Sequence, residues 1–231
     1  MLNVRSVPAQ QKRPAAPHDD RTTRARIRDC AIDVVATEGV TSLSARKVAE
    51  AANVSPGLVI HHFGTMDALR VACDEHVASV IHHHKAAAMA SGAGLDLMAA
   101  FRDAELGTLT GYLAAVLADD SASVSRLVDE LVDNATESTE QGVASGMLRP
   151  TDDPRARAVV LTLWSLGGLV MHRHMQRLLG VDLTDPGVGS TPELARYLAP
   201  AYEILGSGIL TDAFAASTQK AVGDITTARE E

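Results

Sequence analysis

The chain has 231 residues, of which 46% are hydrophobic and 22% are charged, an ordinary composition for a soluble protein with one large or two small domains. The first 20 residues lack the apolar core of a signal peptide, and the longest nearly apolar run, residues 158–171, is too short to cross a bilayer. We therefore predict a cytoplasmic protein with no membrane partner. Two cysteines are too few for a disulfide framework, so Cys30 and Cys73 are expected to be buried, reduced thiols.

Charge is distributed unevenly along the chain. Up to Arg70 there are 10 Lys and Arg against 7 Asp and Glu, whereas the remainder has 11 against 22, for a net charge of −8. A basic N-terminal third joined to an acidic remainder predicts a head that binds a polyanion and a body that repels nucleic acid.

The predicted elements are all helices, because the chain is rich in alanine, has 3% aromatic residues and shows almost no alternating β-branched runs. Residues 1–20 are polar and contain three prolines, so we predict a disordered arm. A first helix is predicted from Arg21 to a stop at Gly39. Later helices are predicted over residues 65–89, 95–118, 122–145, 154–179 and 192–215, with a loop over residues 180–190 and a flexible tail over residues 217–231.

Between these elements lie two short helices joined by a tight corner. Ser44 can cap the first, over residues 45–52, and Ser55 can cap the second, with Pro56 at its first position, where the missing N–H is not needed. This is helix-turn-helix geometry, in which the second helix enters the major groove of DNA, about 12 Å wide. The apolar side of the first helix is formed by Ile27, Ala31 and Val34. The apolar residues of the two short helices and their corner are expected to pack against it: Val48, Ala49, Ala52, Val54, Val59 and Phe63.

The same spacing leaves polar groups facing outward for DNA. Arg46 can give a bidentate donor to guanine, and helix N-termini such as the one at Ser55 offer N–H groups to phosphates. The predicted DNA-binding residues are Ser44, Arg46, Lys47, Ser55, Pro56, Gly57, Leu58, His61 and His62.

The stretch "LSARKVAEAANVSPGLVIHHFGTMDALR" resembles the DNA-binding domain of the TetR family of transcriptional regulators, with the cap, corner, glycine and terminal His-Phe in register. The resemblance implies an all-α protein with a three-helix DNA-binding domain over residues 21–80 (helix-turn-helix about 45–64) and a larger helical domain over residues 81–216. It further implies a homodimer whose larger domain binds a small-molecule effector and thereby releases a double-stranded DNA operator. Repression is the usual activity of proteins similar to this family.

The sequence departs from the family pattern at three positions. Ile60 stands where the family usually has a tyrosine, and Met66 where it usually has a lysine, so two phosphate contacts are missing. Asn53 replaces the usual corner glycine, which is tolerable because asparagine visits the left-handed region. Arginines near the first helix are expected to compensate: Arg21, Arg24, Arg26 and Arg28.

Histidines could indicate a metal site, but their spacing speaks against one. Consecutive helical residues such as His82, His83 and His84 point about 100° apart, and the seven positions from His76 to His83 span about 10 Å. We predict no metal and no cofactor, although a site assembled across helices stays open.

The larger domain has two candidate surfaces. The stripe Leu194, Tyr197, Leu198, Ala201, Leu205 and Gly208 could pair with its symmetry mate, or could be plain core. Apolar residues could line an effector cavity, again with plain core as the alternative: Met89, Met98, Phe101, Tyr112, Trp164, Met171 and Met175.

Enzyme motifs are missing from the sequence. It contains no G-x-S-x-G, H-E-x-x-H or phosphate loop, and Asp129, Glu130 and Asp133 fit a solvated helix face better than a catalytic pair. We therefore predict no catalytic residues and a ligand-responsive DNA-binding regulator. The alternative is a DNA-binding protein with a purely structural dimerisation body and no effector.

Overall fold

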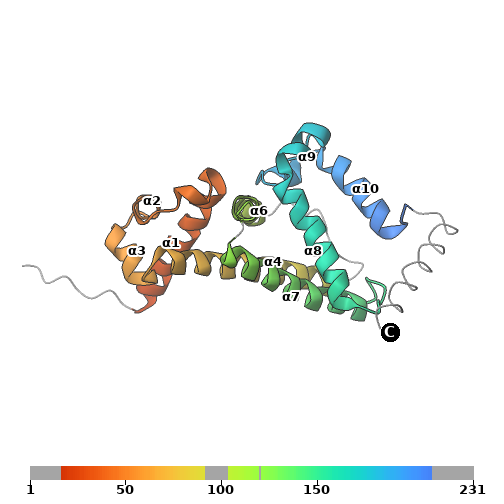
Figure 1. Ribbon diagram of the computed structural model, residues 1–231, viewed down its shortest axis with the longest axis horizontal. Helices are drawn as coiled ribbons and strands as arrows, with labels where there is room; N and C mark the ends of the chain where they lie inside the picture. The colour runs from red at the N-terminus through yellow and green to blue at the C-terminus, as the bar shows by residue number, and fades with distance from the viewer. Residues whose placement is uncertain (1–16, 92–103, 120, 210–231) are drawn as a thin grey trace, which may run out of the picture.

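A computed structural model describes residues 17–91, 104–119 and 121–209, and throughout these ranges the chain forms helices joined by turns (Figure 1). The predicted all-α fold is confirmed. The α-helices are α1 (Pro17–Glu38), α2 (Ala45–Ala51), α3 (Pro56–Phe63), α4 (Met66–Ser91), α6 (Ala104–Val116), α7 (Ala122–Ala144), α8 (Pro154–Val170), α9 (His172–Leu179) and α10 (Leu194–Gly206), with short 3-10 turns η1 (Val40–Ser42) and η3 (Val188–Ser190).

Local chemistry sets the ends of the first helices as predicted. Gly39 follows α1 with φ +82°, a conformation that costs glycine little. The Ser44 hydroxyl accepts the Lys47 N–H at 3.3 Å, and the Ser55 hydroxyl accepts the Leu58 N–H at 3.2 Å. Asn53 takes φ +53° at the corner, so it replaces the usual glycine in the left-handed region.

Three predicted boundaries were wrong. The first helix begins at Pro17, four residues before Arg21, because proline suits the first turn of a helix. The predicted helix over residues 154–179 breaks at Met171, whose φ of −95° and ψ of 15° separate α8 from α9. The break follows the pair Gly167-Gly168, which disfavours helix and allows a kink. The last helix ends at Gly206, and Gly208 follows with φ +74°; residues 210–215 of the prediction lie outside the described ranges.

The predicted core of the DNA-binding domain is confirmed. Ile27, Ala31 and Val34 of α1 are buried, and the facing residues Val48 and Val59 are fully buried. Phe63 is buried and Val54 is half-buried against the same cluster. That cluster continues through α4 into α6 and α7, so the head and the body share one apolar core.

Helix α4 belongs to both parts of the molecule. It starts beside α3 and runs along α7 through the body (Figure 1). Helix α6 packs on α1, and the two backbones approach closely because Gly111 has no side chain: a Cβ there would lie 3.3 Å from Ala36 Cβ. The positions of α4 and α6 are therefore linked to the position of the head.

Candidate nucleic-acid interface

Helix α3 has one face in the core and one face in solvent. Val59 and Phe63 are buried, whereas Gly57, Ile60 and His61 are exposed. The corner is tight because the Val54 N–H donates to Ala49 O at 2.9 Å and the Asn53 N–H donates to Glu50 O at 3.2 Å. Helices α2 and α3 are thus held against α1 with the outer face of α3 free to enter a groove.

The N-terminus of α3 suits a phosphate. Ser55 and Pro56 are exposed there, and a Cβ on Gly57 would meet nothing nearer than the Ser55 hydroxyl at 4.0 Å. The first-turn N–H groups of a helix carry a partial positive charge and have no partner within the helix. Another backbone can therefore approach this end without a steric barrier.

The predicted cations differ in their surroundings. Arg46 is exposed, and within the described part of the chain its side chain forms no ion pair or hydrogen bond. Lys47 forms an ion pair with Glu38 at the end of α1, a contact that the sequence reasoning missed. Ser44 is exposed, Leu58 and His62 are half-buried, and the ring centroids of His61 and His62 lie 5.7 Å apart. All the predicted DNA-binding residues therefore lie on α2, α3 and their caps, with Arg46 the freer of the two cations.

The arginines of α1 have neighbours of their own. The guanidinium of Arg24 lies 4.5 Å from the centre of the Phe63 ring, which connects α1 to the end of α3. Arg28 forms an ion pair with Asp29 at 2.6 Å, and Arg26 is exposed. Arg24 thus has a structural role that the sequence pattern did not indicate.

The two departures from the family pattern have different settings. Ile60 is 40% exposed on the outer face of α3. Met66 begins α4 and is half-buried against the apolar core. A methionine at the head of α4 thus contributes packing in place of a charge.

The residues predicted to line an effector cavity do not gather at one place. Tyr112 is buried and donates a hydrogen bond to Asp74 of α4. Met89 lies fifteen positions after Asp74 on the same helix, which corresponds to a separation of about 22 Å along the helix axis. Trp164 and Met171 are exposed, and Met175 lies by Gly168. Met98 and Phe101 lie outside the described ranges. A single compact cavity cannot contain both Met89 and Tyr112, so this set needs revision.

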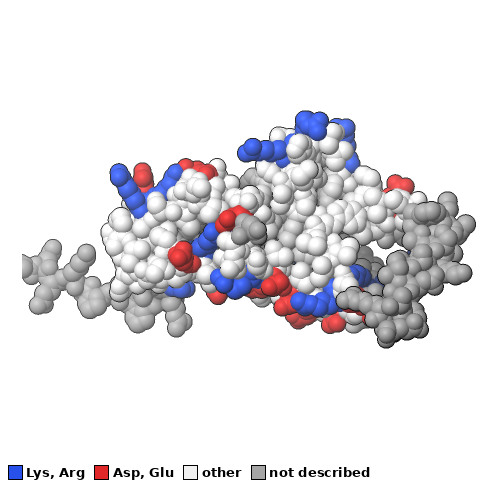
Figure 2. All heavy atoms as spheres, in the orientation of Figure 1, with Lys and Arg blue, Asp and Glu red and all other residues white. Residues whose placement is uncertain are grey.

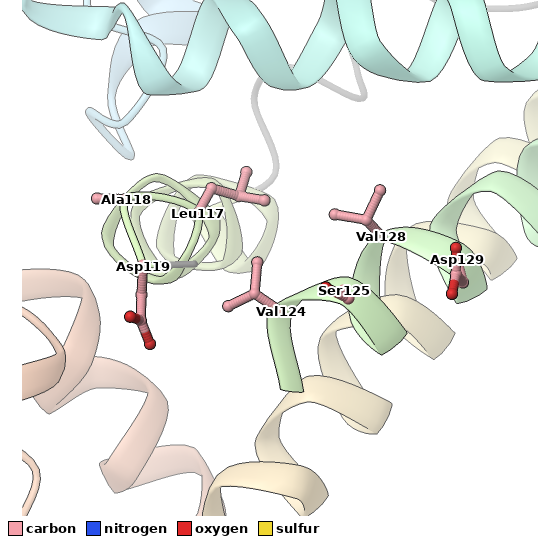
Figure 3. A pocket seen from close by; sticks show the side chains of 7 residues that line it. All are labelled: Leu117, Ala118, Asp119, Val124, Ser125, Val128 and Asp129. Carbon is pink, nitrogen blue, oxygen red and sulfur yellow. The ribbon is translucent and has the colours of Figure 1, made fainter. Parts of the chain in front are cut away.

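The structure has an open hollow of about 470 Å³ where α6 meets α7 (Figure 3). Leu117, Val124 and Val128 point into it, and Asp119 and Asp129 lie at its sides. The hollow is open to solvent, and its lining combines apolar side chains with two carboxylates. None of its residues was in the predicted set, because the hollow depends on how two helices diverge.

Apolar side chains are exposed along one side of α8. Val160, Leu163, Trp164, Gly167 and Met171 follow the spacing i, i+3, i+4, i+7, i+11 and are all exposed. This spacing was readable in the sequence, but which side of α8 faces the body was not. On α10, Tyr202 and Leu205 are exposed, whereas Leu194 is buried with Val181 and Val188. The predicted stripe on α10 is therefore buried at its start and exposed to solvent at its end.

The remaining polar candidates have ordinary surroundings. The described residues contain no group of three or more potential ligands that could hold a metal ion. Burial raises the pKa of the Cys73 thiol to about 12, and burial followed by Asp33 raises the pKa of Cys30, so both thiols stay protonated at neutral pH. Cys30, however, is half-buried where full burial was predicted. Among the described helices, none has the length and apolarity needed to span a bilayer.

Charged side chains of both signs lie along the body. Figure 2 shows Asp and Glu along the edge formed by α4 and α7 with Lys and Arg between them, and a group of Lys and Arg over α9. Of the acids predicted on a solvated face of α7, Asp129 and Asp133 are exposed, whereas Glu130 is half-buried. Asp133 forms an ion pair with Arg155 of α8 at 2.6 Å.

An exposed, capped second helix on a three-helix head defines a helix-turn-helix DNA-binding protein with a larger helical body. Residues 27–73 match the family model described as bacterial regulatory proteins, tetR family, and residues 104–211 match the model described as tetracyclin repressor-like, C-terminal domain. The chain is 34% identical over 194 residues to the HTH-type transcriptional regulatory protein RaaS of Mycobacterium tuberculosis (strain ATCC 25618 / H37Rv), covering 84% of this chain and 89% of that protein. The chain belongs to the TetR family of transcriptional regulators.

Solved structures share the fold. The crystal structure of the reduced form of E. coli NemR superposes with a TM-score of 0.52 at 20% identity, covering 67% of this chain and 89% of that chain. The predicted family and the predicted architecture are thereby confirmed.

Proposed function

We propose that this protein is a cytoplasmic, homodimeric repressor that binds a DNA operator through α3 and is released from it by a small, largely apolar molecule. The observation that carries the proposal is the outer face of α3: Gly57, Ile60 and His61 are exposed beside a capped N-terminus, and Arg46 is exposed on the adjoining helix α2. Arg46 donates to a base edge, while Ser44, Ser55 and the α3 amides hold phosphates.

Dimerisation is proposed through α8 and α10. Both helices expose apolar residues in line, and a two-fold axis would bring each exposed face against its own copy. The dimer would set two α3 helices one turn of DNA apart, about 34 Å. It also doubles the number of phosphates contacted.

We propose that the effector binds in the body and enters through the hollow between α6 and α7. The hollow adjoins Arg70, because Asp119 at its rim forms an ion pair with that residue of α4 at 3.3 Å. Trp164 is 38% exposed on α8, so its fluorescence would report on the α8 face rather than on a buried cavity. DNA release is therefore the more direct readout of an effector.

DNA selection from a random-sequence duplex pool tests the proposal. The wild-type protein should enrich a two-fold symmetric sequence, and Arg46→Ala should fail to enrich the same base at one position of each half-site. Thr136→Val, which removes a hydroxyl bonded within α7 and away from the hollow, is the matched control. Recovery of random sequences by the wild-type protein would refute DNA-binding specificity. If no small molecule from a metabolite and drug panel shifts affinity for the selected DNA, the alternative of a purely structural body is favoured.

A further inference from the structure

Asp74 is a buried acid that the DNA-binding surface does not use. It lies on α4, and the residue is 6% exposed. A buried carboxylate costs free energy unless charges or hydrogen bonds compensate it. Its partners therefore indicate what it holds together.

Both carboxylate oxygens of Asp74 accept a hydrogen bond from the body. The Tyr112 hydroxyl of α6 donates to Oδ1 at 2.7 Å, and the Ser123 hydroxyl of α7 donates to Oδ2 at 3.0 Å. Burial, followed by the charge of Asp74, raises the pKa of Tyr112 far above its usual range, so its hydroxyl remains a donor. Short hydrogen bonds to a carboxylate are stronger than neutral ones. One side chain of α4 thus joins two helices of the body.

A second contact lies one helical turn earlier on α4. Arg70 forms an ion pair with Asp119, in the connection between α6 and α7, at 3.3 Å. Positions four apart share a face of a helix. Arg70 and Asp74 therefore hold the same face of α4 on the junction of α6 and α7.

The same segment of α4 is part of the head. Leu69 and Cys73 are buried in the core cluster with Ile27 of α1 and Val59 of α3. Gly111, next to Tyr112, lies against Ala36 of α1. A shift of α6 or α7 relative to α4 must therefore either break the bonds to Asp74 or move α1 and α3.

We propose that Asp74 is a positioning residue that sets the orientation of the DNA-binding domain on the body through its hydrogen bonds to Tyr112 and Ser123. The intact bonds hold α3 in the orientation that fits the operator. This inference rests on the proposed DNA-binding function.

Reciprocity between coupled sites gives a test that needs no effector. If the junction favours DNA binding, then DNA binding must stabilise the junction by the same factor. The probe is the duplex DNA selected by the wild-type protein. Hydrogen exchange of the amides of residues 109–117 and 121–128 should slow when this DNA is added.

Two variants remove one donor each. Tyr112→Phe keeps the ring that fills the core, and Ser123→Ala changes a half-buried residue. Each should lower affinity for the selected DNA by about 5- to 150-fold, the usual range of coupling between sites, and should abolish the slowing of exchange at the junction on DNA binding. Thr136→Val, whose lost hydroxyl donates at 2.9 Å to Val132 O within α7 and lies outside the hollow, should match the wild type.

The outcomes separate the two proposals. If the wild-type protein selects no DNA, the proposed function fails. If it binds selected DNA while junction exchange stays unchanged, Asp74 does not position the head, although the proposed function stands. Equal losses in Thr136→Val and Ser123→Ala would also overturn the inference, because general softening of α7 would then explain both. If Tyr112→Phe does not fold, Ser123→Ala alone decides.

Discussion

Replacing Leu163 and Leu205 by glutamate should convert the proposed dimer to a monomer. Each side chain is 55% exposed in the single chain, on α8 and α10 respectively. Neither belongs to the buried clusters, so the substitutions should leave the fold of the monomer intact. Leu198 is a poorer target because it is half-buried against Leu194 and Val181, and a charge there would disturb the core.

The size of the effect follows from the exposed area. Complete burial of a leucine is worth about 1.5–3 kcal/mol, so a half-exposed leucine still has about 1 kcal/mol to gain at an interface. Two substitutions in each of two copies remove about 4 kcal/mol of apolar burial, which corresponds to a rise in the dimer Kd of about a thousandfold. Repulsion and desolvation of the introduced carboxylates add to this loss.

Sedimentation velocity over a range of protein concentrations is the assay. The double variant should sediment as a monomer at concentrations where the wild type is a dimer, and circular dichroism should show unchanged helix content. Leu178→Glu is the control, because Leu178 is 62% exposed on α9, outside both faces. An unchanged dimer Kd in the double variant would refute the assignment of the interface to α8 and α10.

Three further predictions concern the head. Arg46→Ala should cost about 1–3 kcal/mol at one base position, as measured by competition with single-base operator variants; an equal loss on every sequence would identify a phosphate contact instead. Arg24→Ala should lower the free energy of unfolding by about 0.5–1 kcal/mol in thermal unfolding, because the contact of the guanidinium with the Phe63 ring is lost. The slope of log DNA affinity against log salt concentration should not change; a decrease of about one unit would instead show that Arg24 contacts a phosphate. Cys73 should resist alkylation in the native state, and the free energy of unfolding should fall as pH rises from about 9 toward 12, because the folded thiol keeps its proton longer than the unfolded one; a Cys73→Ser variant with the same pH profile would exclude this cause.

Local sequence signals were sufficient to predict the helix-turn-helix. Its signals act over three or four residues: the hydroxyls of Ser44 and Ser55 cap helices, Pro56 suits a first turn, and Gly39 ends α1. The inward spacing of Val48 and Val59 is equally local. Interactions of such short range depend little on the rest of the fold, so the sequence pattern predicted them correctly.

The tertiary structure decided everything that joins residues far apart in the chain. Periodicity marked apolar stripes on α8 and α10, but the packing of α8 on α7 leaves Leu163 in solvent, and contacts with Val181 and Val188 bury Leu194. Tyr112 was predicted to line a cavity, but its hydroxyl donates to the carboxylate of Asp74, 38 positions earlier in the chain. Helical spacing specifies which residues share a face and not which partner that face meets, because the partner is selected by the free energy of the whole packed core.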